Sequence, residues 1–117
     1  MTLTVYHNPR CRKSREAIKY LEDNGVSYDV IKYLEQSFDK NKLAEVLEKI
    51  EKKPSEIVRK SDALWKQEYA TKNLTEDQIL LLLVEQPKLI ERPIITSTYK
   101  GVLARPIENL REFLNKC

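Results

Sequence analysis

The first third of the chain changes the spacing of its apolar residues twice. Apolar and polar residues alternate over 3–5, which predicts a short strand. The apolar positions of 17–21 then follow the spacing of a helix face, and Gly25 stands where a helix would end. Alternation returns over 26–30, so this part of the chain is predicted to form a βαβ unit.

The middle of the chain has the apolar spacing of helices. Residues 43–50 predict one amphipathic helix, and 54–58 and 64–69 predict two short helical turns. Residues 75–78 have the types of a capping box and come directly before the apolar run 79–84. This run is apolar almost all round, which favours a buried helix. A partner-binding zipper is the other interpretation, but the run is short and has no heptad repeat.

The last part of the chain returns to the spacing of strands. Residues 94–95 begin a strand, 99–101 carry a turn signal, and 102–103 predict the partner strand. Pro106 is predicted to open a final helix. The element order is therefore βαβ, helices, ββα, which predicts an α/β fold with a helical insertion over about 38–88.

The composition is typical of one globular domain, taken here as 1–117. The 117 residues are 41% hydrophobic and 33% charged. The net charge of +3 is mild and both signs are interspersed, so we expect no direct nucleic-acid binding. No apolar run approaches the ~20 residues of a membrane span, and the N-terminal residues lack the pattern of a signal peptide. The two cysteines are too distant to suggest a disulfide framework, and we expect a cytoplasmic protein.

Cys11 is the candidate nucleophile. It lies where the first strand ends and the first helix begins, with Asn8 expected as N-cap and Pro9 in the first helical position. The positive end of a helix and its unpaired N–H groups favour a thiolate over a thiol. Four cations surround it in sequence: Arg10, Arg12, Lys13 and Arg15. A chance surface cysteine in a basic helix is the alternative, and this segment by itself does not decide between the two.

The chain resembles a known family in four places. The first is the pattern Tyr6-His7-Asn8-Pro9-x-Cys11-x-x-Ser14-Arg15, and the later ones are Arg59 in Ile57-Val58-Arg59-Lys60, Arg92-Pro93-Ile94 and Arg105-Pro106. Taken together in this order they are similar to the glutaredoxin-coupled arsenate reductases, within the ArsC/Spx-like family. The resemblance runs from about the second residue to near the end. It implies a thioredoxin-like fold, with a mixed four-stranded sheet and the helical segment inserted between the βαβ and ββα units.

The resemblance also implies a reaction and its site. Cys11 would attack arsenate or a similar oxyanion. That oxyanion would be held by Arg59, Arg92 and Arg105, because guanidinium groups bind oxyanions bidentately. Lys60 beside Arg59 leaves open which of the two cations faces the site. Glutathione would serve as cosubstrate and glutaredoxin as partner, with no bound cofactor and no metal.

Two positions narrow this chemistry. Ser14 stands where a dithiol oxidoreductase keeps its second cysteine, so a C-x-x-C disulfide cannot form and an external thiol must resolve the adduct. Ala17 stands where arsenate reductases of the low-molecular-weight phosphatase type place an arginine, so the sequence excludes that type. Ser14 agrees with the glutathione dependence that the resemblance implies, and Ala17 means that the oxyanion must be held by arginines distant in sequence.

Five residues are expected to support the site: His7, Asn8, Ser14, Arg15 and Pro93. His7 either tunes the thiolate or bonds to backbone at the strand end. Asn8 is interpreted as a cap first and an anion ligand second, and Ser14 either donates to the thiolate or caps locally. The resemblance implies that Pro93 is a cis-proline facing the thiol. Cys117 is expected to be an oxidisable, non-catalytic thiol, with a resolving cysteine as the alternative.

One departure from the family pattern concerns the substrate. Arg12-Lys13 stand where well-studied members often have Gly-Thr, and glycine lets backbone approach an anion closely. This departure affects the choice of arsenate more than it affects the reactive thiol. Two other functions therefore stay open. One is a glutathione-dependent thiol reductase of another substrate, and the other is an Spx-like regulator that binds the α subunit of RNA polymerase.

Overall fold

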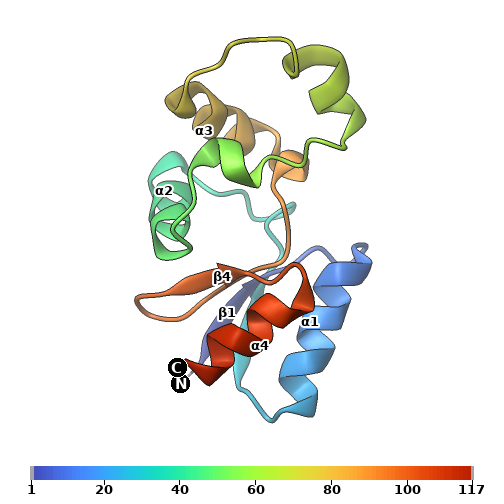
Figure 1. The fold of residues 1–117 in the computed structure, drawn as a ribbon, viewed down its shortest axis with the longest axis vertical. Coiled ribbons are helices and arrows are strands. Elements are labelled where there is room, and N and C mark those ends of the chain that lie inside the picture. The colour runs from blue at the N-terminus through green and yellow to red at the C-terminus, as the bar shows by residue number, and fades with distance from the viewer. Residues whose placement is uncertain (1, 117) are drawn as a thin grey trace. The chain divides into compact units, whose positions relative to one another are not determined.

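The computed structural model describes residues 2–116, and these divide into two compact units. One unit joins the residues up to Gln36 with those from Arg92 onward, and the other is Ser37–Glu91. In Figure 1 the blue N-terminal segments and the red C-terminal segments lie together in the first unit. The second unit contains the segment predicted as a helical insertion. The interpretation of 1–117 as one domain stays a prediction.

The first unit is built on a mixed four-stranded sheet with the order β2-β1-β3-β4. The two central strands are β1 (Leu3–Tyr6) and β3 (Ile94–Thr96), and the edges are β2 (Tyr28–Ile31) and β4 (Gly101–Leu103). β1 runs parallel to β2 and antiparallel to β3, which in turn runs antiparallel to β4. The predicted strands and the mixed four-stranded sheet are therefore confirmed.

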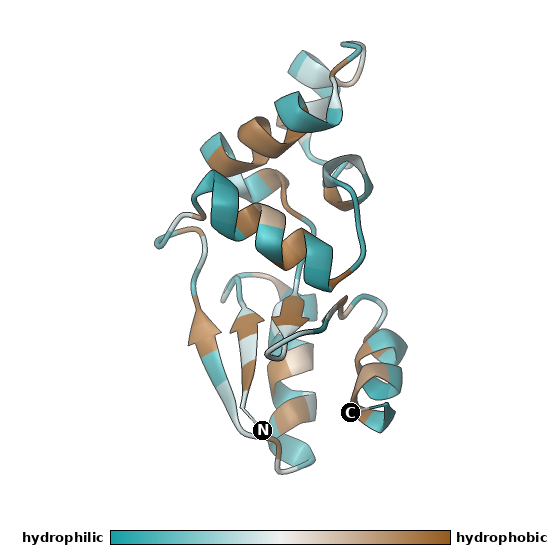
Figure 2. Cartoon of the chain, turned by 90° about the vertical axis from the view of Figure 1, so that its left-hand side faces the viewer, coloured by the Kyte–Doolittle hydropathy of each residue, from teal (hydrophilic) through white to brown (hydrophobic). Residues whose placement is uncertain are grey.

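Two helices share one apolar core with this sheet. They are α1 (Arg12–Asp23) and α4 (Ile107–Asn115). Figure 2 shows both with apolar and polar segments alternating along the helix, as expected for helices with one buried face. The core residues come from both helices, from β1 and β3, and from the segment after β4: Leu3, Val5, Ala17, Leu21, Ile95, Ala104 and Leu110.

The ends of these helices show why the chain turns where it does. After α1, Gly25 has a φ of 65°, a conformation that glycine adopts without a steric cost. Gly25 N donates to Glu22 O and Val26 N donates to Leu21 O, which is the Schellman pattern of a helix C-terminus. The predicted helix end at Gly25 is thus confirmed. At α4 the prediction was one residue off, because Pro106 has extended backbone and is the N-cap rather than the first helical residue.

The second unit is helical, as the sequence predicts. Its elements are α2 (Lys40–Lys49), η1 (Pro54–Ile57), η2 (Trp65–Tyr69), α3 (Glu76–Glu85) and η3 (Pro87–Leu89). The predicted capping box is present, since Gln78 N donates to Thr75 Oγ1 at 3.2 Å and Thr75 N donates to Gln78 Oε1 at 2.8 Å. The apolar run in α3 is mostly buried, but Leu81 is 45% exposed. Among residues 2–116 no helix has the length and apolar character needed to cross a membrane.

Candidate active site

The turn between β1 and α1 places Cys11 at the helix end. His7 N donates to Ile31 O at 2.9 Å, which continues the pairing of β1 with β2. Asn8 then forms a tight turn, because its Oδ1 accepts from Arg10 N at 3.0 Å and its backbone oxygen accepts from Cys11 N at 3.0 Å. Cys11 has extended backbone and is the N-cap residue of α1. The thiol therefore lies directly at the positive end of the helix.

This geometry corrects the prediction for the helix start. Asn8 is not the N-cap and Pro9 is not the first helical residue, since α1 begins at Arg12. The physical reason is that the Asn8 side chain accepts from a backbone N–H two residues on, which stabilises a local turn instead of a helix. The correction moves the helix N-terminus onto the candidate nucleophile itself.

The thiol of Cys11 is partly buried and has a lowered pKa. Burial alone raises this pKa, because it disfavours the charged form. Hydrogen bonds outweigh that effect: the backbone N–H groups of Ser14 and Lys13 and the side chain of Arg92 all donate to the sulfur, and the charge of Arg92 adds to them. The net pKa of Cys11 is below its ordinary value, so the thiolate form is favoured.

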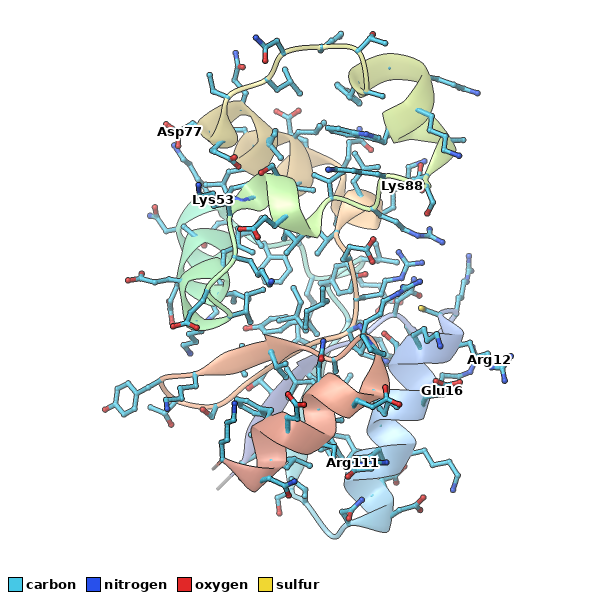
Figure 3. The ribbon with its side chains drawn as sticks, in the orientation of Figure 1. Arg12, Glu16, Lys53, Asp77, Lys88 and Arg111 are labelled. Atoms are coloured by element: carbon cyan, nitrogen blue, oxygen red, sulfur yellow. The ribbon has the colours of Figure 1, made fainter. Side chains whose placement is uncertain are left out.

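The positive charge beside the sulfur comes from Arg92. The sequence alone suggests that it comes from the cations adjacent to Cys11 instead. Arg12 Nε lies 3.2 Å from Glu16 Oε1, and Lys13 Nζ lies 3.9 Å from Glu16 Oε2. Figure 3 shows the Arg12 and Glu16 side chains together on the outer side of α1. Arg15 Nη1 donates to Pro9 O at 2.9 Å. The charges of Arg12 and Lys13 act only weakly, because both side chains are exposed and water screens them.

Sheet pairing brings Arg92 to the thiol. β3 lies antiparallel to β1 with Ile94 opposite Tyr6, and continuing this register places Arg92 across from Asn8. Arg92 is only 7% exposed, so its charge acts in a poorly solvated place. The Arg92–Pro93 peptide bond is cis, as the resemblance implied for Pro93. The role of Pro93 toward the thiol stays a prediction.

The other two predicted oxyanion ligands occupy different units. Arg105 follows β4 in the sheet unit and precedes a second cis bond, to Pro106. Its backbone oxygen accepts from Asn109 Nδ2 at 3.2 Å. Arg59 belongs to the helical unit, where its Nη1 lies 3.7 Å from Asp62 Oδ2. The neighbouring Lys60 is exposed. Oxyanion binding by Arg59 and Arg105 stays a prediction.

Ser14 supports the turn through its side chain and the thiol through its backbone. It is fully buried, and its Oγ accepts from Asn8 N at 3.3 Å. The backbone N–H of the same residue donates to the sulfur of Cys11. Asn8 is also buried and is occupied by its own turn contacts. Ser14 therefore fixes the loop that carries the thiol. Cys117 lies outside the described residues.

His7 is buried, and its surroundings favour the neutral form of the imidazole by lowering its pKa. Burial lowers its pKa most, and the nearby charges of Lys32 and Arg15 lower it further. A neutral imidazole adds no positive charge to the site. Its Nδ1 is buried and has no hydrogen-bond partner among residues 2–116. Sequence reasoning missed Lys32, although it directly follows β2, where the carboxyl ends of two parallel strands meet.

Among the described residues, no group of acidic, histidine and cysteine side chains is arranged to hold a metal ion. The chemistry available at this turn is that of a thiolate stabilised by backbone N–H groups and one buried guanidinium. A thiolate of this kind acts as a nucleophile toward a sulfur of a disulfide or toward the electrophilic central atom of an oxyanion.

Comparison with known proteins gives consistent results along nearly the whole chain. The model of the ArsC family matches residues 6–113. An arsenate reductase of Neisseria meningitidis is 34% identical over 114 residues, covering 96% of this chain and 97% of that protein. "Uncharacterized protein YfgD" of Escherichia coli is 37% identical over 112 residues, covering 94% of each chain.

A solved structure, an arsenate reductase from Vibrio cholerae, has the same fold. Its TM-score is 0.88 at 34% identity, with 96% of this chain and 97% of the other covered. The thioredoxin-like α/β fold predicted from the sequence is thereby confirmed.

Proposed function

Because the chain belongs to the ArsC family, we propose that it is an arsenate reductase-like thiol oxidoreductase with Cys11 as its nucleophile. The observation that carries this proposal is the position of Cys11 at the N-terminus of α1, where two backbone N–H groups and the buried side chain of Arg92 lower the pKa of its thiol. A reactive thiol of this kind is what nucleophilic attack on an oxyanion requires.

In the proposed reaction the Cys11 thiolate attacks the arsenic atom. A sulfur–arsenic bond forms, and one arsenate oxygen leaves as water after protonation. Arg92 is suited to bind the oxyanion because its charge is already directed at the sulfur. Arg105 and Arg59 are proposed as the further ligands, on the basis of the family resemblance.

Glutathione is proposed to attack the Cys11 adduct, and glutaredoxin then completes the reduction to arsenite and regenerates the thiol. Over the cycle two thiols lose one electron each and become a disulfide, while As(V) gains two electrons and becomes As(III). Ser14 supports the need for an external thiol, because it leaves no second cysteine beside Cys11. Thiol chemistry of this kind fits a reducing compartment, and the cytoplasm is the proposed location.

The positions of Arg12 and Lys13 in the structure are compatible with arsenate as the substrate. The bulky Arg12 replaces a glycine that is common in the family, but its side chain is 84% exposed and pairs with Glu16. The neighbouring Lys13 contributes its backbone N–H to the sulfur, which is the contact that close backbone approach would provide. The side chains at these two positions therefore do not occupy the hydrogen-bonding side of the thiol.

The test is a coupled assay that follows NADPH oxidation with arsenate, glutathione, glutaredoxin and glutathione reductase. We expect arsenate-dependent turnover that is absent in Cys11→Ser. Turnover should stop when glutathione is omitted. No arsenate-dependent turnover by a folded protein would contradict the proposal.

Two alternatives are then separated by further measurements. Exchange of Cys11 with glutathione disulfide, without arsenate turnover, would favour a glutathione-dependent thiol reductase of another substrate. Co-purification with the α subunit of RNA polymerase would favour an Spx-like regulator.

A further inference from the structure

Two cations lie beside the Cys11 turn without a role in the reaction proposed above. They are Lys32, which directly follows β2, and Arg15 of α1. His7 directly follows β1. The two strands are parallel with Tyr6 opposite Ile31, and His7 N donates to Ile31 O at 2.9 Å. Lys32 and His7 are therefore neighbours at the carboxyl ends of the strands, where α/β folds bind their ligands.

The second cation is held at the same place from the helix side. Arg15 Nη1 donates to Pro9 O at 2.9 Å, which ties its guanidinium to the loop that carries Cys11. The charges of both Lys32 and Arg15 lower the pKa of His7, so both reach the vicinity of that ring. Both side chains are exposed, and neither has a carboxylate within ion-pair distance among residues 2–116.

The His7 ring, on which both charges act, has incomplete hydrogen bonding. His7 is 8% exposed, and its Nδ1 has no hydrogen-bond partner in the described part of the chain. Buried polar atoms normally have a partner, and an exception points to a missing ligand or water. Two cations with no acidic partner among residues 2–116 and one buried imidazole nitrogen thus lie around the turn between β1 and α1 that carries Cys11.

We propose that Lys32 and Arg15 form a cationic subsite beside Cys11 that binds a carboxylate of the thiol cosubstrate. This proposal rests on the thiol chemistry assigned to Cys11 above. The ligand class is a small thiol or disulfide that carries carboxylates, as glutathione does. Lys32 is the specificity-determining residue, because Arg15 is also bound to the loop backbone.

The physical need for such a subsite comes from the exchange step. The Cys11 thiolate attacks one sulfur of a disulfide, a new S–S bond forms, and the old one breaks. The leaving thiolate takes the electron pair and is protonated by water. An anionic disulfide approaches a thiolate against charge repulsion, and nearby cations offset that repulsion and raise the local concentration of anions.

The test compares three disulfides that differ in charge and needs no arsenate. They are glutathione disulfide (anionic), 2-hydroxyethyl disulfide (neutral) and cystamine (cationic). The rate of adduct formation at Cys11 is followed by mass spectrometry of the mapped peptide. The variants are Lys32→Gln, Lys32→Arg and, as a matched control, Lys100→Gln, an exposed lysine in the turn between β3 and β4.

In Lys32→Gln we expect the preference for glutathione disulfide over the neutral disulfide to fall about threefold, which is typical for loss of one exposed charge contact. Lys32→Arg and Lys100→Gln should keep the preference, and high salt should weaken it in the wild type. An equal change with all three disulfides in Lys32→Gln would overturn the subsite. So would an equal loss of preference in Lys100→Gln. If the wild-type protein prefers glutathione disulfide over the neutral disulfide but does not turn over arsenate, only the proposed function is contradicted.

Discussion

At the scale of single residues, the reactivity of Cys11 depends on a contact that spans most of the chain. The backbone N–H groups of Ser14 and Lys13 are local to the helix start, but the guanidinium of Arg92 comes from the residue pair before β3. Arg92 is also buried, so its charge is less screened by water than those of the exposed cations around Cys11. We infer that Arg92 adds a charge and a hydrogen bond to the effect of the Ser14 backbone N–H in lowering the pKa of the thiol.

The first prediction concerns this acidity. Arg92→Gln should raise the pKa of Cys11 from its lowered value, because a charge and a charge-assisted hydrogen bond to the thiolate are both lost. Alkylation rate against pH measures the change, with Cys117→Ser as the background. Arg111→Gln is the control, since Arg111 is exposed on α4 and should leave the profile unchanged. If the pH profile of alkylation is unchanged in folded Arg92→Gln, Arg92 does not affect the pKa of Cys11.

The lowered pKa of Cys11 also makes the free energy of unfolding depend on pH. The folded-state pKa of Cys11 lies below that of an ordinary cysteine. The thiolate therefore adds to the free energy of unfolding at pH above the unfolded value, and this contribution is lost as pH falls through the folded value. Urea unfolding of wild type and Cys11→Ala at several pH values should show a difference that shrinks toward acid pH.

The second prediction separates charge from geometry at Arg92. Arg92→Lys keeps the charge but not the bidentate fork. We expect arsenate turnover to fall by ~30- to 1,000-fold, on the order of 2–4 kcal/mol in the transition state. Arg111→Lys should have wild-type kinetics, because that side chain is exposed on the outer helix. Wild-type turnover in both variants would exclude Arg92 as an oxyanion ligand.

At the scale of elements, the sequence predicts types well and one boundary poorly. The apolar spacing is enough to place β1, α1 and β3, because their apolar residues are buried, and also β4, which is half-buried along its length. The start of α1 was missed because Asn8 and Pro9 satisfy the rules for a helix start and equally those for a turn. The residue types alone do not decide whether the Asn8 side chain caps a helix or closes a turn.

The third prediction tests the end of α1. Gly25→Ala should lower the free energy of unfolding by about 1–2 kcal/mol, the cost of a left-handed conformation for a residue with a Cβ. An added Cβ would meet no atom within 4 Å, so crowding does not contribute. Gly25→Asn should cost less, because asparagine tolerates this conformation. If urea unfolding shows a larger loss for Asn than for Ala, the positive φ is not the cause.

At the scale of the whole molecule, apolar spacing predicts the order of the elements, but only the family resemblance assigns Arg92 to the site, and nothing in the sequence pointed to Lys32. The segment predicted as an insertion, about 38–88, lies within the compact unit Ser37–Glu91. The contact of Arg92 with the thiol follows from the pairing of β1 with β3, which are far apart in sequence. Lys32 was missed for the same reason, since its position beside His7 depends on parallel pairing of two strands.

The fourth prediction concerns which thiol reduces the Cys11 adduct. Ser14 leaves Cys11 without a neighbouring thiol, so glutathione disulfide should give a single adduct that maps to Cys11. Cys117→Ser should keep most arsenate turnover, whereas Cys11→Ser should abolish it. Peptide mapping and the coupled assay measure the two effects. A Cys11–Cys117 disulfide as the main oxidised species, formed without glutathione, would contradict an external reductant.

The antiparallel pairing of β3 with β1 has a consequence for how the protein matures. Cys11 is synthesised early, but Arg92 belongs to the last quarter of the chain and reaches the sulfur only when the sheet is assembled. A nascent chain on the ribosome would therefore carry a thiol without its guanidinium partner, with acidity closer to that of a free cysteine. The fraction of Cys11 present as thiolate at neutral pH therefore reaches its full value only when folding is complete, so this thiol reacts more slowly with oxidants in an unfinished chain than in the folded protein.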